Sequence, residues 1–490
     1  MWDGTYETAK HMKLRKFSAA AALLAGAAML NDAPQLYADQ AKIALFGGTV
    51  INPGDGRIIE NAIITIDGGT IVSVESAKEK AVPPLEQSIN ATGKFILPGY
   101  IDTHIHFFQS GGLFTRPDAV DLNSVRPYKD EVAWIKSHLD ETFARYLQCG
   151  ITSVIDVGGP MWNFGVRKRA NTTANAPRVA IAGPLISSVA RPQLDLGDPP
   201  IVKIDTPEQG RRFVRKLAAQ KPDYIKIWYV VSPDSPVEKF RPVVHAVIEE
   251  SHAKKLRVAV HATELEAARA AVEEGADLLV HSVTDKLVDD AFVRLLKEKQ
   301  TILTPTLVVF ERYGRTFANQ LNLTPEEKAW GDPEVLGTLD VTKLPEDKVP
   351  MRISETLAKP DAVLERIQQT YDVALKNLKT LQDAGITIAA GTDAGNIGTL
   401  HGPSLFREFQ LMKQAGLTPM QILQSTTANA AKTFGGATGV RIGALAPGKY
   451  ADLVVLNSNP LDDIAHASDL QAVFKNGEIY PAKSLEQNPE

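Results

Sequence analysis

The hydrophobic and polar positions of this chain change period repeatedly between about residue 100 and residue 390. Short apolar runs, typical of buried strands, alternate with longer stretches in which apolar residues recur at helical spacing. We predict eight strands from these runs: Tyr100–His106, Thr152–Val157, Val179–Ala182, Tyr224–Val230, Arg257–His261, Leu278–His281, Ile302–Val309 and Ile386–Ala390. The helical stretches between them are Glu131–Leu147, Pro207–Gln220, Val237–Ala253, Glu264–Glu274, Asp289–Lys299 and Asp361–Asp383. This alternation favours a parallel sheet, and eight repeats predict an α/β fold in the form of a closed (β/α)8 TIM barrel.

Both ends of the chain have a different pattern. Residues 41–80 carry β-branched runs broken by turns, and strand-like segments return at Lys449–Leu456 and Ala472–Gly477. We predict a small β-sandwich domain built from residues 41–97 and 438–490, and a barrel over residues 98–437. A long connection at about residues 310–359 follows the seventh strand, so we expect it to form a lid over the site. A peripheral or oligomer-contact insertion is the alternative.

The first 40 residues match neither pattern. Met1–His11 look like an added leader. From Met12 the chain has the features of a secretory signal, with three basic residues, an apolar run over Phe17–Leu30 and a cleavage-like Leu36–Ala38. We therefore predict a periplasmic or secreted protein with no integral membrane span in the mature chain. A cytoplasmic location follows if the segment is not functional, and a buried or amphipathic terminal helix is the alternative.

Composition narrows the function classes. The chain has 490 residues, 44% hydrophobic residues and a formal net charge of -5, which is ordinary for a globular enzyme. We find no basic stripe and expect no nucleic-acid partner. The single cysteine, Cys149, excludes an intramolecular disulfide and a cysteine-based zinc site. Any metal ligands must therefore be His, Asp, Glu or Lys.

The first predicted strand carries a candidate half of a metal site. Side chains alternate between the faces of a strand, so His104 and His106 point the same way. Two neighbouring imidazoles suit a divalent ion, although two histidines satisfied by hydrogen bonds are an equally good reading of this pair alone.

Further candidate ligands end other predicted strands: Lys226, His261, His281 and Asp393. A lysine inside the apolar segment Asp223–Trp228 is costly unless its charge is paired or removed, and carbamylation is one way to remove it. Each of these residues alone is more often structural. Because a barrel gathers the carboxyl ends of its strands at one mouth, together they predict a site for two metal ions. His104, His106 and Asp393 would hold one ion, His261 and His281 the other, and Lys226 would bridge them.

At these residues the chain resembles the amidohydrolase superfamily, in particular its imidazolonepropionase-like group with metal-dependent dipeptidases and ochratoxinase-type amidases. The resemblance runs from about Lys42 to the C-terminus. Its segments are PGYIDTHIH, IKIW, VAVHATELEAARAAVEEGADLLVHS, AAGTDAG, TANAAKTFG and GALAPGKYADLVVLNSNP. The resemblance implies a barrel with a small β domain, two divalent ions, expected to be zinc, and a carbamylated Lys226 as bridging ligand.

Such a site predicts hydrolysis of an amide C–N bond in an N-acyl amino acid or dipeptide-like substrate. A hydroxide bridging the metals would attack the carbonyl carbon, and Asp393 would move the proton to the leaving amine. Candidate substrate contacts are Tyr229, Arg191 and His401, each with a structural role as its alternative. We expect a homo-oligomer that acts on a small molecule.

Three other functions stay open. His261 and Glu264 fit the His-x-x-Glu pattern of mononuclear deaminases and cyclic-amide hydrolases, although Glu264 also suits the first turn of the next helix. The same site would serve ester, lactone or phosphotriester hydrolysis. A non-catalytic binding protein is expected to have lost ligands, and here all six are present.

Overall fold

The structure is a computed structural model, and it describes residues 42–78 and 87–481. The leader and the signal-like segment predicted before residue 40 lie outside the described residues. In the part of the chain that the structure describes, no helix is both long and apolar enough to cross a membrane.

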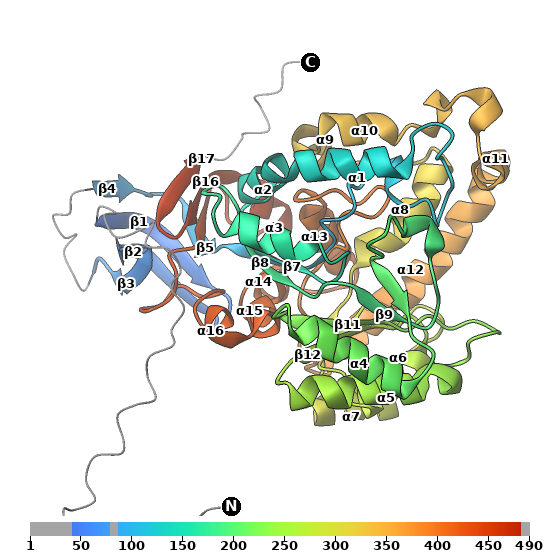
Figure 1. The fold of residues 1–490 in the computed structure, drawn as a ribbon. Coiled ribbons are helices and arrows are strands. Elements are labelled where there is room, and N and C mark those ends of the chain that lie inside the picture. Colours follow the sequence, from blue (N-terminus) through green and yellow to red (C-terminus); the bar gives the residue numbers. More distant parts are fainter. Residues whose placement is uncertain (1–41, 79–86, 482–490) are drawn as a thin grey trace, which may run out of the picture. The chain divides into compact units, whose positions relative to one another are not determined.

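Strands from the two ends of the chain join in one eight-stranded sheet (Figure 1), as the sequence pattern predicts. Strand β15 pairs antiparallel with β5, with Leu453 opposite Pro98. The apolar side chains of this sheet form a core of their own around Ile64, Ile96 and Leu453. The strands are β1 (Ile43–Asn52), β2 (Arg57–Asp67), β3 (Thr70–Ser76), β4 (Gln87–Asn90), β5 (Phe95–Pro98), β15 (Leu453–Leu456), β16 (Leu470–Lys475) and β17 (Glu478–Pro481).

The middle of the chain forms two sheets in which every strand pair is parallel, so the predicted α/β class is confirmed. One sheet contains β6 (Tyr100–Ile105), β7 (Ile151–Asp156) and β8 (Arg178–Ile181). The other has the order β10-β9-β11-β12-β13-β14, with β9 (Leu185–Ser187), β10 (Ile201–Lys203), β11 (Tyr224–Trp228), β12 (Arg257–His261), β13 (Leu278–Val280) and β14 (Ile302–Thr304). The described strands therefore do not form one continuous closed sheet. The short strands β9 and β10 have no counterpart among the predicted strands.

Residues 386–390, predicted as the eighth strand, are not a regular strand but connect the two parallel sheets. Leu303 of β14 forms a parallel bridge with Ile388, and Thr103 of β6 donates its N–H to the carbonyl of Ala390 over 3.0 Å. On the other side, the Asp223 N–H donates to the Ile181 carbonyl at the end of β8 over 2.8 Å. The carboxyl ends of these strands are thereby brought to one side.

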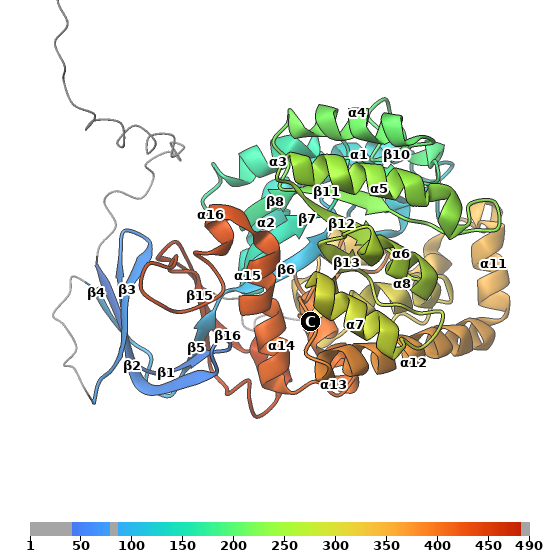
Figure 2. The ribbon, with the colours of Figure 1, turned by 90° about the horizontal axis from the view of Figure 1, so that it is seen from below.

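Helices follow the strands, and α4 to α7 lie one after another along β11 to β13 (Figure 2). Local sequence explains their ends: Thr206 and Gln209 form a capping box at the start of α4, and Pro207 occupies its first turn. The predicted helix 131–147 is broken at His138 into two helices. The helices are α1 (Tyr128–Ser137), α2 (Leu139–Gln148), α3 (Asn163–Ala170), α4 (Pro207–Ala218), α5 (Val237–Ala253), α6 (Leu265–Glu273), α7 (Asp290–Lys299), α12 (Pro360–Asp383), α13 (Ser404–Gln414), α14 (Pro419–Thr426), α15 (Ala428–Phe434) and α16 (Gly436–Gly439).

The predicted seventh strand is wrong beyond Thr304, because helix α8 (Leu307–Phe317) begins there. Thr306 has a left-handed backbone (φ 46°), which turns the chain out of the sheet. The carboxylate of Glu408 then accepts the N–H groups of Leu307 and Val308, which the first turn of a helix leaves unpaired. The apolar residues after β14 therefore belong to a helix and not to a strand. The segment predicted as a lid continues through α9 (Pro325–Trp330), α10 (Pro333–Thr338) and α11 (Met351–Ala358).

Candidate metal centre

All six predicted metal ligands line one cavity of about 300 Å³. They come from segments far apart in the chain. His104 lies in β6 and His106 directly after it, Lys226 in β11 and His261 at the end of β12, while His281 follows β13 and Asp393 follows the segment 386–390.

The donor atoms are close enough to share ions. Oδ1 of Asp393 lies 3.1 Å from Nε2 of His106 and 3.4 Å from Nε2 of His104. Ligand atoms of His104, His281 and Asp393 all lie within 4.8 Å of one another. The ring centroids of His261 and His281 are 4.4 Å apart, and those of His104 and His281 are 4.9 Å apart. The two groups of ligands predicted from the sequence are therefore adjoining parts of one cluster.

Several of these buried polar atoms have no hydrogen-bond partner among the described residues. Both ring nitrogens of His104 and Nζ of Lys226 are in this state. A buried polar atom without a partner costs about 1–3 kcal/mol, and a metal ion or a carbamate group would supply the missing interactions. Neutral imidazole nitrogens and a carboxylate oxygen are also ligands that zinc and related divalent ions accept. The donor set fits a divalent metal site.

Two of the histidines are oriented by hydrogen bonds on the ring nitrogen that faces away from the cluster. Nδ1 of His106 lies 2.6 Å from the carbonyl oxygen of Gly158 and therefore donates to it. Nδ1 of His281 lies 2.6 Å from the hydroxyl oxygen of Thr306. The carbonyl contact fixes the tautomer of His106, and both contacts orient their rings and leave the other nitrogen, Nε2, for an ion.

Burial and neighbouring charges shift the pKa values of these residues towards the protonation states that can bind a metal ion. Burial, with the Lys226 ammonium as a further cause, lowers the pKa of His104 well below its usual range, and burial lowers the pKa of His281 to about 3. Burial also lowers the pKa of Lys226 to about 7. Burial opposes the ionisation of Asp393, but the imidazoles of His104 and His106 outweigh it and hold the pKa of this carboxyl well below its usual range. His104 and His281 are therefore held as neutral imidazoles, and Asp393 as a carboxylate, at neutral pH.

The backbone at two of these residues adopts a conformation that only glycine accepts readily. Asp393 has a φ of 62° and His281 a φ of 80°. Gly395 follows with a φ of 104°, and a Cβ there would lie 2.5 Å from the carbonyl oxygen of His106. Left-handed non-glycine residues cost about 1–3 kcal/mol and are concentrated at functional sites.

The remaining cavity wall is mostly apolar, with a few polar groups. Its aromatic members include Phe108, Trp228, Phe310 and Tyr313. Its polar members outside the ligand cluster are Gln109, Arg116, Thr263, Tyr313 and Asn396. Arg116, Tyr313 and Asn396 are not predicted by any sequence pattern described above, and the only signal for any of them is the position of Asn396 three residues after Asp393.

Of the three predicted substrate contacts, Tyr229 lies outside the cavity. Its ring is buried against Phe240, and its hydroxyl donates to the carbonyl of Val237 over 2.5 Å. Trp228, the preceding residue, lines the cavity instead. Neighbouring residues of an extended chain point to opposite sides, so only one of the two can face the site.

Arg191 lies next to the cavity wall but is not part of it. Its guanidinium carbon lies 5.0 Å from the ring centroid of Trp228, and its Nε lies 3.4 Å from a carboxylate oxygen of Asp118. The same carboxylate binds Arg116, which does line the cavity. Two guanidinium groups therefore share one carboxylate, which leaves an excess of positive charge at this side of the cavity.

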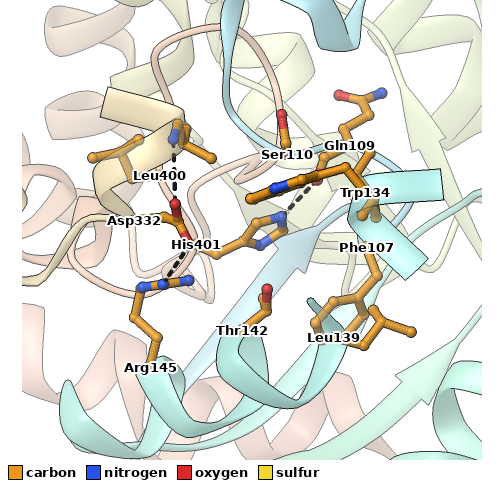
Figure 3. Close-up of a pocket in the computed structure, with 12 residues that line it drawn as sticks. Phe107, Gln109, Ser110, Trp134, Leu139, Thr142, Arg145, Asp332, Leu400 and His401 are labelled. Carbon is orange, nitrogen blue, oxygen red and sulfur yellow. Dashed lines mark hydrogen bonds and ion pairs between the residues drawn. The ribbon is translucent and has the colours of Figure 1, made fainter. Parts of the chain in front are cut away.

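His401 belongs to a second, smaller cavity of about 10 Å³ (Figure 3). Its Nε2 lies 2.8 Å from the carbonyl oxygen of Gln109 and its Nδ1 lies 2.7 Å from the hydroxyl oxygen of Tyr146. Both ring nitrogens thus have protein partners. Glu264 does not line the metal cavity either; it precedes helix α6 and one of its carboxylate oxygens is buried without a partner.

Comparisons with known proteins agree with this fold. A Xaa-Pro dipeptidase structure with bound methionine has 22% sequence identity and a TM-score of 0.67, and the alignment covers 90% of this chain and 100% of that one. The A. niger ochratoxinase has 23% identity and a TM-score of 0.68, covering 91% and 96%. A molinate hydrolase has 20% identity and a TM-score of 0.65, covering 92% and 98%. At these identities the likeness concerns the fold, and no curated protein gives a significant match to this chain.

The family assignment comes from a sequence model. The model described as "Amidohydrolase family" matches residues 95–480, a range that contains all six residues of the cluster. The resemblance predicted from the sequence segments is thereby confirmed, and the chain belongs to the amidohydrolase family.

Proposed function

We propose that this chain is a metal-dependent hydrolase that cleaves an amide C–N bond in an N-acyl amino acid or a dipeptide-like substrate. The observation that carries the proposal is the cluster of four histidines, Lys226 and Asp393 around one cavity, with buried nitrogen atoms that lack protein partners. We further propose that the two parallel sheets with the segment 386–390 correspond to a (β/α)8 barrel, and that residues 310–359 act as a lid. Phe310 and Tyr313 on the cavity wall support the lid assignment.

His104, His106 and Asp393 would hold one divalent ion, and His261 and His281 the other. Lys226, as a carbamate, would lie between them; its isolation from protein partners supports this role. When bound, such ions lower the pKa of a water molecule and polarise a carbonyl group. We expect zinc because the donors are imidazoles and carboxylates.

The chain's own residues would carry the proton. Asp393 accepts a proton from the attacking water as its oxygen bonds to the carbonyl carbon, and delivers that proton to the nitrogen as the C–N bond breaks. Arg116 would bind the carboxylate of the substrate, because two guanidinium groups share the single carboxylate of Asp118 beside the cavity. The apolar wall around Trp228 and Phe310 would bind an apolar acyl or side-chain group and exclude bulk water.

The test combines metal content with a substrate panel. We expect about two metal ions per chain by mass spectrometry of the purified protein, and hydrolysis of N-acyl amino acids in preference to the matching amides that lack a carboxylate. Replacing Asp393→Asn should abolish turnover while most of the metal stays bound. Unchanged turnover in this variant would refute the proton-transfer role.

A mononuclear hydrolase is the second candidate, and one observation favours it. The ligand atoms that lie within 4.8 Å of one another come from His104 and Asp393 of the first predicted ion site and from His281 of the second. A single ion per chain together with an unmodified Lys226 in a peptide mass map would support this candidate over the two-metal site.

A further inference from the structure

Four cavity-lining residues form an ordered chain of hydrogen bonds that ends on Asp393. Nη1 of Arg116 donates to Oδ1 of Asn396 over 2.7 Å, and the Tyr313 hydroxyl donates to the same oxygen over 2.6 Å. Nδ2 of Asn396 then donates to Oδ1 of Asp393 over 2.7 Å. This series of hydrogen bonds links the segment after Leu113–Thr115, helix α8 and the loop after Asp393.

The chemistry of the four side chains fixes which group donates and which accepts in each of these hydrogen bonds. A guanidinium group only donates hydrogen bonds, so the atom of Asn396 that faces Arg116 must be the carbonyl oxygen. The amide nitrogen must then face Asp393. Arg116 is itself held by both carboxylate oxygens of Asp118, at 2.7 Å each, and its Nη1 also donates to the Tyr313 hydroxyl over 3.1 Å. The orientation of the Asn396 amide is therefore determined by two donors that are anchored independently of Asp393.

The consequence at Asp393 is that its two oxygens differ. Oδ1 accepts the hydrogen bond from Asn396 and faces Nε2 of His106 and His104. No hydrogen bond to Oδ2 is found among the described residues, whereas Oδ1 accepts the one from Asn396. A carboxylate held by one oxygen cannot rotate freely, so the other oxygen is kept available at a fixed place in the cavity.

We propose that Asn396 is a positioning residue that fixes the rotation of the Asp393 carboxylate, so that Oδ2 stays available for proton transfer. Arg116 and Tyr313 act by holding the amide of Asn396 in the orientation that this requires. The proposal rests on the proton-transfer role proposed above for Asp393, but it makes a separate structural claim about how that side chain is oriented.

A purely structural role for Asn396 has to be separated from this one. Its Nδ2 also lies 3.2 Å from the backbone carbonyl oxygen of Asp393, a contact that would order the loop without positioning the carboxylate. The useful variant is Asn396→Asp. It keeps the size of the side chain and an acceptor for Arg116 and Tyr313, and it replaces the N–H that reaches Asp393 with a carboxylate oxygen that cannot donate and carries negative charge.

We expect N396D to lower kcat by about 10- to 100-fold, the usual cost of losing a partner that orients a metal-site ligand, with KM little changed. Metal content per chain should equal that of the parent. A loss of metal, an unchanged kcat, or an effect confined to KM would overturn the proposal.

Crystal structures provide a readout that does not depend on activity. In N396D the Asp393 side chain should adopt a different rotamer or two conformers, whereas the parent keeps one. An unchanged Asp393 rotamer would overturn the proposal even if the enzyme hydrolyses amides. Conversely, a parent protein that hydrolyses no amide but shows the rotamer change would refute the proposed function and leave the positioning claim standing.

The Tyr313→Phe variant tests the outer part of the chain. Because Arg116 still donates to Asn396, we expect Y313F to reduce kcat less than N396D does, and to have no further effect in the double variant. Tyr100→Phe is the matched control, since its buried hydroxyl donates to the Ala467 carbonyl over 2.9 Å outside the cavity. The effects of Y100F and N396D should be additive. Additive effects of Y313F and N396D would show that Tyr313 does not act through Asn396.

Discussion

Two buried histidines of this molecule, His104 and His401, have opposite hydrogen-bond environments. His401 is fully satisfied, with Nε2 paired to the Gln109 carbonyl (Figure 3). Its Nδ1 is paired to the Tyr146 hydroxyl, and its ring stacks on Phe107 at a centroid distance of 5.8 Å. His104 is buried at least as deeply, yet neither of its ring nitrogens has a hydrogen-bond partner among the described residues. Burial alone therefore does not mark a ligand; a buried ring nitrogen without a hydrogen-bond partner among the described residues is the feature that His104 has and His401 lacks.

The difference has an energetic meaning. Each unpaired buried polar atom costs about 1–3 kcal/mol, and the ligand cluster contains several of them together with left-handed backbone at Asp393 and His281. A bound ion would offset these costs. An ion near His401 would not lower the free energy in this way, because both ring nitrogens of His401 already have hydrogen-bond partners. The first cluster therefore fits a metal site, whereas the polar groups around His401 satisfy one another.

The largest effect is expected for His104→Ala. Removing a ligand should weaken metal binding and turnover by more than the 10- to 100-fold typical of losing an orienting partner. The metal-free variant should be less stable than the metal-free parent because removing the buried ring leaves a cavity, but it loses no ring hydrogen bond seen among the described residues. Metal titration and thermal unfolding in the presence of a chelator measure both quantities. Full metal retention by H104A would remove the distinction between the two histidines.

The next effect concerns the partner of a ligand. Thr306→Ala removes the hydroxyl that pairs with Nδ1 of His281, and we expect metal affinity to fall by about 10- to 100-fold without unfolding. Thr306→Ser keeps the hydroxyl and should restore affinity. If the serine variant binds metal as weakly as the alanine variant, the contact does not orient His281.

His401→Phe should show the reverse pattern. It leaves the Tyr146 hydroxyl and the Gln109 carbonyl without their present partner, so the free energy of unfolding should fall by about 1–3 kcal/mol. Metal content should stay at the level of the parent. Urea denaturation and metal analysis of the same sample make the comparison, and a loss of metal with unchanged stability would assign His401 to the site after all.

The smallest effect is a pH dependence. Burial lowers the pKa of His401 from 6.5 to about 4, so between these values the unfolded chain binds a proton that the folded chain does not. Stability should therefore be fully present above pH 6.5 and fall as the pH drops towards 4, by at most about 1.4 kcal/mol per pH unit from this residue. Urea unfolding at pH 7, 6 and 5 should show a shallower decline for H401F than for the parent. Parallel declines would contradict the shifted pKa.

The sequence pattern predicted a large part of this molecule. Alternation in β6 placed His104 and His106 on one face, and the strand ends supplied Lys226, His261, His281 and Asp393, which the structure brings to one cavity. These predictions depend on local periodicity and on the rule that parallel strands gather their carboxyl ends, and both can be read without a structure. The β domain from both chain ends also followed from local turn and strand signals.

Tertiary structure decided which polar side chains find partners. Tyr229 and Trp228 are equal candidates in the sequence, and packing against Phe240 turned the first away from the cavity. His401 follows the same loop as Asp393, but Tyr146 and Gln109, distant in the chain, satisfy it. Arg116 and Tyr313 reach Asn396 from segments that no local pattern connects. The sequence by itself determined the elements and their faces, because these depend on neighbours along the chain. The pairing of each polar atom depends on neighbours in space, and it separates a ligand from a structural residue.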